Sequence, residues 1–274
     1  MAWEDVDTGW GRQAPTFAYL FENLHWREYA ALLDQTDVGT NTRYLDIACG
    51  AGLAVQLASA RGAQATGLDA SARLTAIAAA RSPGAAVHVG DMFQLPFADA
   101  SFDVATSFRG IWGNGREALR EARRVVRPGG CVGLSFWGNQ RRMQAYPLFA
   151  VLGQTAESER AHTGALVSIS RPGVAEQLMT DAGLVPGART TLRLHWEFPD
   201  VEVAAQALAS TGPAYLAIQH LGAEVFMASA RAAATGLYVE GLGSARAAAT
   251  GLYVEGLGVR AEVELQLLVG VVPG

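Results

Sequence analysis

Three aspartates, Asp46, Asp69 and Asp91, recur at intervals of 23 and 22 residues, about the length of one strand and one helix. Each stands at or just after the end of a short apolar run typical of a buried strand. Because the carboxyl ends of parallel strands meet at one edge of a sheet, we expect the three carboxylates to lie along that edge. After Asp46, Gly50 and Gly52 allow the backbone to turn tightly and to approach a ligand. The spacing therefore predicts a site for a nucleotide-like ligand.

The chemistry of each carboxylate narrows the choice of ligand. Asp69 suits the two hydroxyl groups of a ribose, because a carboxylate can accept two hydrogen bonds. Asp91 is followed by Met92 and Phe93, which suits the exocyclic amine of a purine beside an apolar wall. Asp46 suits a cationic amine. S-adenosylmethionine combines these groups with a positively charged sulfur, and we predict it as the cofactor.

A dinucleotide cofactor fits the same stretch less well. The G-x-G-x-x-G/A fingerprint places its third small residue at position 55, which is Val55. A pyrophosphate would also meet the negative charge of Asp46 beside the loop. An NAD(P)-dependent oxidoreductase is therefore the less favoured alternative.

Alternating strand and helix patterns position these residues. Strands are expected at 43–47, 65–68, 86–89, 102–107 and 132–137, and helices at 53–61, 71–81 and 115–126. Ser71 is the expected N-cap of the second helix. The alternation predicts an α/β fold in which a mostly parallel sheet carries helices on both faces.

The flanking segments are expected to cover the site. An amphipathic helix at 16–33 would form an N-terminal helical lid over residues 1–40, ahead of a cofactor-binding core at 41–138. Residues 139–274 would complete the sheet, with strands at 189–198 and 262–272. Most of the remaining residues there are expected to be helical, and they would form a cap over the ligand crevice.

The fifteen residues 229–243 are repeated without change at 244–258. Each copy is expected to form a short helix, at 230–234 or 245–249, followed by a glycine-rich loop. One hypothesis is that the second copy is a tolerated surface elaboration. The other is that it reshapes the substrate entrance or builds a subunit contact.

The motifs LDIACGAG, GLDAS, VGDMFQLPFADASFDVATS and EARRVVRPGGCVGLSFWG, within residues 45–138, resemble the class I S-adenosylmethionine-dependent methyltransferases. The resemblance is strongest to the type 11 branch, which includes the ubiquinone and menaquinone biosynthesis enzymes. It implies a Rossmann-like sheet of seven strands, mostly parallel, with an antiparallel last strand.

The resemblance also implies a role for each residue of these motifs. Those at the methionine end of the cofactor would be Asp46, Ala48, Gly50 and Gly52, with Ala48 standing where many members have glycine. Asp69 and Ala70 would hold the ribose, Asp91 and Met92 the adenine, and Ser107 and Phe108 would form the floor of the crevice. The implied reaction is in-line transfer of a methyl group to oxygen, nitrogen or carbon of a small-molecule acceptor. A non-catalytic protein that binds or senses S-adenosylmethionine is the alternative.

The acceptor side is less well defined by the sequence. Trp10, Phe108, Arg109 and Trp112 are candidates for the substrate pocket, and Trp137 and Trp196 are further aromatic candidates. His25 in the lid and His220 in the cap are candidates for a general base, should the acceptor need one. An ordinary structural histidine is the simpler interpretation of each.

Composition excludes several other functions. The net charge of −5 argues against a general nucleic-acid binder. All 21 basic residues are arginines, which excludes lysine Schiff-base chemistry. Cys49 and Cys131 form neither a disulfide framework nor a metal-ligand pair, and no metal is expected. No long apolar run suggests a membrane span and no signal peptide opens the chain, so a cytoplasmic protein is expected, with a homodimer as a hypothesis.

Overall fold

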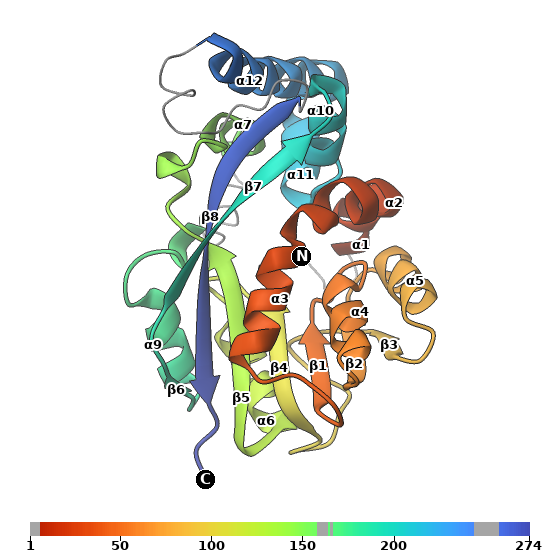
Figure 1. Cartoon of the computed structure of the whole chain (residues 1–274), viewed down its shortest axis with the longest axis vertical. Coiled ribbons are helices and arrows are strands. Elements are labelled where there is room, and N and C mark those ends of the chain that lie inside the picture. Colours follow the sequence, from red (N-terminus) through yellow and green to blue (C-terminus); the bar gives the residue numbers. More distant parts are fainter. Residues whose placement is uncertain (1–5, 158–163, 165–166, 244–257) are drawn as a thin grey trace.

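Eight strands form one sheet in the order β3-β2-β1-β4-β5-β8-β6, with β7 also paired to β8 (Figure 1). The computed structural model describes residues 6–157, 164, 167–243 and 258–274. The strands are β1 (Arg43–Ile47), β2 (Gln64–Asp69), β3 (Ala86–Val89), β4 (Phe102–Phe108), β5 (Val126–Trp137), β6 (Val185–Pro186), β7 (Thr190–Phe198) and β8 (Val259–Val271). The first five run parallel, and β8 runs antiparallel to β5. The predicted α/β fold with an antiparallel last strand is thereby confirmed.

The additional strand, β6, lies just before the strand expected at 189–198. Val185 and Pro186 pair with Val271 and Gly270 of β8, and after a break the chain pairs with β8 again from Thr190. Proline has no N–H to donate to a ladder, so a strand that contains it is readily interrupted. The expected seventh and last strand therefore becomes β8, paired with two pieces of its neighbour.

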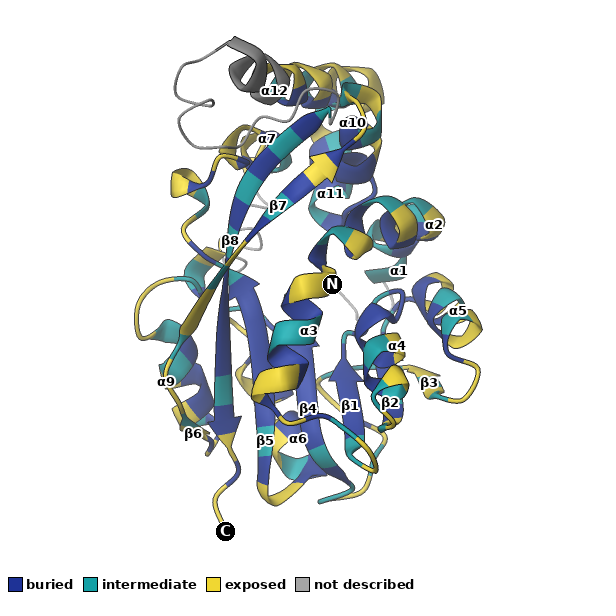
Figure 2. Ribbon diagram, viewed as in Figure 1, coloured by how far each residue is buried: buried dark blue, intermediate teal, exposed yellow. Residues whose placement is uncertain are grey.

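Helices cover both faces of the sheet. On one face α3 (Trp26–Gln35) and α4 (Leu53–Ala60) pack on the strands, and α5 (Ala72–Arg81) lies beside α4. On the other face lie α6 (Arg116–Val125) and α9 (Val174–Asp181). Figure 2 shows the central strands between these layers as almost wholly buried. The parallel strands read as apolar runs because both of their faces are covered.

The N-terminal segment is helical, but it is not the single helix expected at 16–33. After α1 (Val6–Gly9), a 3₁₀ turn (Gly11–Gln13) and α2 (Ala14–Thr16), a π turn (Phe17–Phe21) and a second 3₁₀ turn (Glu22–His25) lead into α3. The apolar period is correct, since Phe17, Phe21, Tyr29, Leu32 and Leu33 are buried. Three polar residues on the same face, Glu22, His25 and Glu28, are buried too, and their partners are described below.

We call four helices the cap: α7 (Tyr146–Leu152), α10 (Val201–Ala209), α11 (Gly212–Leu221) and α12 (Ala223–Gly243). They share one hydrophobic core with the N-terminal segment and with β7 and β8, in which Trp196 is fully buried. Among the described residues, no helix has the length and apolar character needed to cross a membrane.

The expectation for the first copy of the repeat is wrong. Helix α12 continues through Gly236 to Gly243, where a glycine-rich loop was predicted. Phe226, Ala230 and Ala234, spaced four residues apart, are fully buried, and packing of such a stripe stabilises the part of α12 that precedes Gly236. Residues 244–257 of the second copy lie outside the described residues.

Candidate active site at the carboxyl edge of the sheet

The loop between β1 and α4 has the backbone conformation that its small residues predict. Ala48, Gly50 and Gly52 all have positive φ angles, of 57°, 56° and 84°. A Cβ atom at Gly52 would lie 2.5 Å from the Cβ of Ala78, so only glycine lets α4 start this close to α5. The methyl group of Ala48 fits because residue 110 is a glycine: a Cβ atom at Gly110 would lie 2.5 Å from that methyl group.

Asp69 ties this loop to the start of α5. Its Oδ2 accepts a hydrogen bond from the backbone N–H of Gly50 at 2.8 Å, and its Oδ1 accepts one from Ser71 at 2.8 Å. Ser71 caps α5 as predicted, since its Oγ accepts from the N–H of Leu74 at 3.2 Å. Burial raises the pKa of Asp69, and the backbone N–H groups oppose that rise. Each carboxylate oxygen keeps a lone pair for a further donor.

Asp46 lies deeper, at the end of β1. Its Oδ1 accepts a hydrogen bond from Thr106 at 3.0 Å, and the Thr106 hydroxyl meets the Tyr44 hydroxyl at 2.5 Å. Burial raises the pKa of Asp46 well above its usual range, and the charges of Glu22 and Asp69 add to this effect. A cation bound beside these carboxylates would relieve their mutual repulsion.

Asp91 starts the loop that follows β3. Its Oδ1 accepts a hydrogen bond from the N–H of Phe93 at 2.9 Å, and the Phe93 ring is 44 % exposed. Met92 packs against the core beneath. The three predicted carboxylates therefore do stand at consecutive strand ends, with an apolar side chain beside the third.

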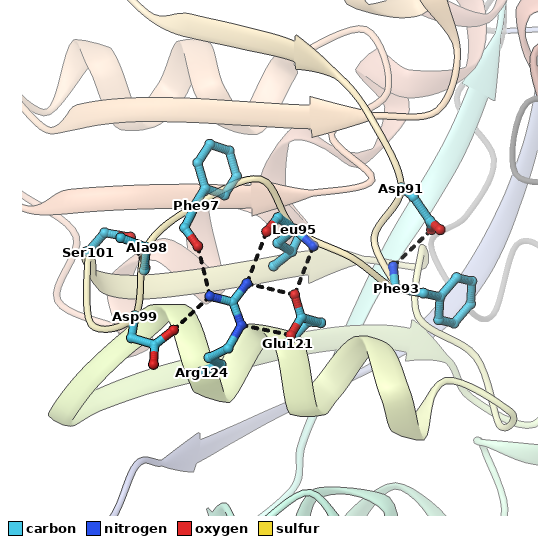
Figure 3. A network of polar contacts seen from close by, with 9 residues as sticks. All are labelled: Asp91, Phe93, Leu95, Phe97, Ala98, Asp99, Ser101, Glu121 and Arg124. Atoms are coloured by element: carbon cyan, nitrogen blue, oxygen red, sulfur yellow. Dashed lines mark hydrogen bonds and ion pairs between the residues drawn. The ribbon is translucent and has the colours of Figure 1, made fainter.

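Arg124 of α6 holds the rest of that loop in place (Figure 3). Its guanidinium donates to the carbonyl oxygens of Phe97 at 2.7 Å and Leu95 at 2.9 Å, and it pairs with Glu121 and Asp99. Glu121 in turn accepts from the N–H of Leu95 at 2.8 Å. The other arginines of α6 are also engaged: Arg116 pairs with Asp181, Arg120 pairs with Glu117, and Arg123 donates to the carbonyl oxygen of Gly183.

Ser107 and Phe108 end β4 at the same edge. The Ser107 Oγ is buried and has no hydrogen-bond partner among the described residues. An orphaned buried hydroxyl calls for an explanation, and a ligand is one. The Ser107 hydroxyl and the carboxylates at the strand ends together fit a cationic nucleoside such as S-adenosylmethionine. Phe108 packs edge-on against Tyr29 of the lid, with ring centroids 4.4 Å apart.

Arg109 is more constrained than the sequence suggested. It has a positive φ of 58°, pairs with the fully buried Glu28, and donates to the Tyr29 hydroxyl at 3.1 Å. Glu28 also accepts from the hydroxyl of Ser135. Burial lowers the pKa of Arg109 to about 9. The charge of Arg109 is already compensated by that of Glu28, which argues against a contact between Arg109 and an anionic acceptor.

The two candidate bases lie in different settings. Nε2 of His25 accepts from the indole N–H of Trp196 at 3.0 Å, and Nδ1 lies 3.1 Å from the carbonyl oxygen of Phe21, to which it must donate. Burial, and then the charge of Arg109, lower the pKa of His25 well below 6.5. Both ring nitrogens are engaged, so this geometry favours the structural interpretation. His220 is exposed in the last turn of α11.

The remaining aromatic candidates lie in different parts of the structure. Trp10 packs edge-on against Phe17 and covers Gly212 of the cap, where a Cβ would overlap its indole ring. Trp112 is half-buried beyond β4 and donates from its indole N–H to the carbonyl of Arg109 at 2.8 Å. Trp137 and Trp196 pack against each other in the shared core, 5.6 Å apart. The structure therefore brings Phe108, Arg109 and Trp112 together and places Trp10 against the cap.

Sequence reasoning missed the buried charges of the lid. Glu22 pairs with Arg81, and Glu28 pairs with Arg109. One signal was present: Glu22, His25 and Glu28 fall on the apolar face of the amphipathic segment, where polar residues need partners. The identity of those partners was not readable, because they lie 59 and 81 residues away in the chain.

Comparison with known proteins agrees with this geometry. A family model described as a methyltransferase domain matches residues 45–134. The chain is 32 % identical over 187 residues to a malonyl-(acyl-carrier protein) O-methyltransferase of Erwinia pyrifoliae, covering 68 % of this chain and 67 % of that protein. It is 35 % identical over 130 residues to a demethylmenaquinone methyltransferase of Chlorobaculum parvum, and it spans about half of that relative, with 43 % of this chain and 54 % of the relative aligned.

Solved structures share the fold at low identity. The YcgJ protein of Bacillus subtilis matches with a TM-score of 0.57 at 18 % identity, over 91 % of this chain and 100 % of that one. A phosphoethanolamine N-methyltransferase of Haemonchus contortus, solved with S-adenosylhomocysteine, matches with a TM-score of 0.60 at 15 % identity, over 100 % of this chain and 61 % of that one. From its matched domain, its relatives and its fold, the chain belongs to the S-adenosylmethionine-dependent methyltransferase family.

Proposed function

We propose that this protein transfers the methyl group of S-adenosylmethionine to a small-molecule acceptor. One observation carries the proposal: Asp46, Asp69 and Asp91 stand at consecutive strand ends beside a glycine loop, and the buried Ser107 hydroxyl at the same edge has no partner among the described residues. This set of groups complements a nucleoside that carries a positive charge.

Each residue has a defined task in this proposal. Asp69 and Ala70 bind the ribose, Asp91 and Met92 the adenine, and Asp46 with the glycine loop the methionine end. When bound, the cofactor supplies a methyl group that is electrophilic without further activation. The chain's own contribution is to hold the acceptor in line with that methyl group and to exclude water, and positioning of this kind is worth roughly 7–11 kcal/mol of a barrier.

The acceptor would approach between the lid and the end of β4, where Phe108, Arg109 and Trp112 gather. The Glu28–Arg109 pair fixes α3 of the lid over this edge. The named substrates of the two sequence relatives are a quinone precursor and an acyl group on a carrier protein. An acceptor of largely apolar character is consistent with the quinone and with the aromatic residues here. No residue is assigned as general base, because the ring nitrogens of His25 are both engaged and His220 is exposed on the cap.

Two experiments test the proposal. Calorimetric titration should show binding of S-adenosylmethionine and S-adenosylhomocysteine, and no binding of nicotinamide cofactors; binding of a nicotinamide cofactor alone would overturn it. Incubation with labelled S-adenosylmethionine and a metabolite extract should then label an acceptor. Binding without any transfer would favour the non-catalytic alternative.

A further inference from the structure

A buried carboxylate of the lid lies directly over the glycine loop. Glu22 is in the 3₁₀ turn that precedes α3, and its side chain is only 2 % exposed. Its Oε1 would lie 3.3 Å from a Cβ atom placed on Gly50. Glu22 therefore fills the space next to the loop at which we place the methionine end of the cofactor.

Arg81, the last residue of α5, is the partner of this carboxylate. Its guanidinium pairs with Oε2 of Glu22, donates to the carbonyl oxygen of Ala51 at 3.0 Å, and donates to that of Ala18 at 2.8 Å. The ring of Tyr19 lies 5.4 Å from the guanidinium carbon. Arg81 is thus fixed by groups on both the loop and the lid, and Glu22 is its one ion-pair partner in the described part of the chain.

The position of Glu22 is electrostatically unfavourable. Burial raises the pKa of Glu22 to about 7, although Arg81 and the backbone N–H groups of Leu53 and Ala51 oppose the rise. Asp46, Tyr29, Cys49 and Arg109 are all close enough to sense the charge of Glu22. A buried carboxylate in such surroundings is retained mainly by its counter-ion.

We propose that Arg81 binds the carboxylate of the cofactor's methionine end, and that Glu22 competes with this carboxylate for the guanidinium. The inference rests on the proposed function, because it takes the methionine end to lie at Gly50. A second carboxylate at this guanidinium would raise the pKa of Glu22 further, so Glu22 must lose its charge by taking up a proton or turn away from Arg81. The ligand carboxylate arrives with its own ammonium group, which Asp46 can receive, whereas Glu22 brings an uncompensated charge.

The backbone around Glu22 is suited to release it. The residues before it form a π turn, and Glu22 itself starts a 3₁₀ turn. Both have poorer hydrogen-bond geometry than an α-helix and often mark functional hinges. Rewinding of this short stretch would turn Glu22 away from the loop and leave α3, held by Glu28 and Arg109, in place.

The test compares two ligands by calorimetric titration. S-adenosylhomocysteine carries the amino-acid end, and 5′-methylthioadenosine lacks it but keeps the nucleoside. Glu22→Gln should bind S-adenosylhomocysteine about tenfold more tightly than the wild type, since loss of a charged competitor is worth about one factor of ten or more. Arg81→Gln should bind it at least about tenfold more weakly. Both variants should bind 5′-methylthioadenosine as the wild type does.

Arg61→Gln is the matched control. Arg61 also joins the lid to the core, pairing with Asp34 at 2.8 Å and donating to the carbonyl of Ala30 at 3.2 Å, but it follows the far end of α4. This variant should leave both affinities unchanged. An affinity change of the same size in Arg61→Gln would show that any loosening of the lid has the effect, and the competition would be wrong.

The outcomes separate the two proposals. If the wild type binds neither S-adenosylhomocysteine nor S-adenosylmethionine, the proposed function fails. If it binds them and Glu22→Gln binds equally or more weakly, the competition alone fails, and weaker binding would assign Glu22 to the ligand's ammonium group. Should Glu22→Gln not fold, as judged by lost 5′-methylthioadenosine binding, Arg81→Gln decides: selective loss of S-adenosylhomocysteine supports the proposal, and unchanged affinity overturns it.

Discussion

Asp69 has a structural task in addition to its proposed contact with the ribose. Its two oxygens hold the N–H groups of Gly50 and Ser71, one from the loop and one from the start of α5. Removal of the whole side chain would therefore disturb the loop as well as the ligand contact. An isosteric change separates these effects better, because asparagine keeps one oxygen and the same shape.

Asp69→Asn should weaken binding of both S-adenosylhomocysteine and 5′-methylthioadenosine by at least about tenfold, because both ligands contain the ribose. It should also cost about 1–3 kcal/mol of unfolding free energy, because one backbone N–H would face the amide nitrogen. Calorimetric titration and chemical denaturation measure the two effects. Asp34→Asn, at an exposed ion pair, is the control and should change neither by much. Unchanged affinity of Asp69→Asn for both ligands would remove Asp69 from the cofactor site.

His25 gives the protein a pH-dependent stability. Its pKa is lower in the folded chain than its ordinary value of 6.5, so the unfolded chain takes up the proton first as the pH falls. The contribution of His25 is present above pH 6.5 and is lost as the pH drops below it. Glu22 and Asp46, whose pKa values are raised, act in the opposite sense, and their stabilising contribution is lost as the pH rises.

His25→Gln should therefore make the unfolding free energy fall less steeply as the pH drops below 6.5. Glutamine can accept from the Trp196 indole with its oxygen and donate to the Phe21 carbonyl with its nitrogen, without gaining a charge. The difference in unfolding free energy between wild type and variant, followed down to about pH 5, isolates His25, since the carboxylates are common to both. Methyl transfer should persist with the same pH profile. Abolished transfer, or a changed profile, would instead identify His25 as the base.

At the scale of elements, the start of α4 depends on contact between two helices. Gly52 is its N-cap with a φ of 84°, and a Cβ there would lie 2.5 Å from the Cβ and 2.8 Å from the Cα of Ala78. Neither atom of Ala78 can swing aside, because one is backbone and the other is attached to it directly. The second glycine of the loop thus serves packing, while Gly50 lies beside Glu22.

Gly52→Ala should destabilise the fold by about 2–4 kcal/mol, from backbone strain and overpacking together. It should also weaken S-adenosylhomocysteine binding, because α4 must shift. Gly39→Ala is the matched control, since Gly39 has no atom within 4 Å of the added Cβ and no positive φ. Its effect should stay below about 1 kcal/mol. Chemical denaturation of both variants checks the pair, and equal stabilities would contradict the packing role of Gly52.

The elements that sequence patterns predict well are those stabilised locally. The strands at 43–47 and 86–89 have the predicted bounds, and Ser71 caps α5 as expected. The strand predicted at 132–137 begins earlier, at Val126, so Arg127-Pro128-Gly129-Gly130 is part of β5, whose register with β4 shifts between Phe102 and Val104. A bulge of this kind depends on the neighbouring strand, and a single segment does not show it.

The same holds for the residues of the candidate site: those placed by local patterns were predicted, and those that depend on distant contacts were not. The strand-end aspartates were readable because topology alone places them at one edge. The compensation of Arg109 by Glu28 was not, because it depends on how the lid folds back across the sheet. The long helix α12 was missed because its glycines suggest a loop. Its packing against α10 and α7 cannot be read from the segment itself.

For the whole molecule, the lid and the cap act as one body because they share a hydrophobic core. Phe17 and Phe21 of the lid belong to the same buried cluster as Leu208 of α10 and Phe226 of α12. Arg12 also donates to the carbonyl of Ala209 at 2.8 Å. Movement of the lid during ligand exchange would therefore be transmitted to the cap, whose helix α12 lies at the end of the molecule opposite the C-terminus (Figure 1).

Deletion of one copy of the fifteen-residue repeat should leave fold and cofactor binding intact. Either deletion yields the same chain, in which the retained copy supplies the buried Ala230 and Ala234 and the Arg231–Glu202 pair at 2.7 Å. Gly258 has a φ of 73° and lies too close to the carbonyl of Pro199 for any Cβ. Its counterpart Gly243, which ends α12 in the full chain, would take this place before β8, so the last turns of α12 must unwind to make the connection.

The expected change in unfolding free energy is small, because the residues that must unwind lie beyond the buried Phe226, Ala230 and Ala234 of α12. Thermal denaturation, S-adenosylhomocysteine titration and light scattering on the deletion variant measure stability, cofactor affinity and oligomeric state. Unchanged values in all three would make the second copy a tolerated elaboration. A shifted oligomeric state would show that it builds a subunit contact, and impaired methyl transfer at unchanged cofactor affinity would show that it shapes the entrance for the acceptor.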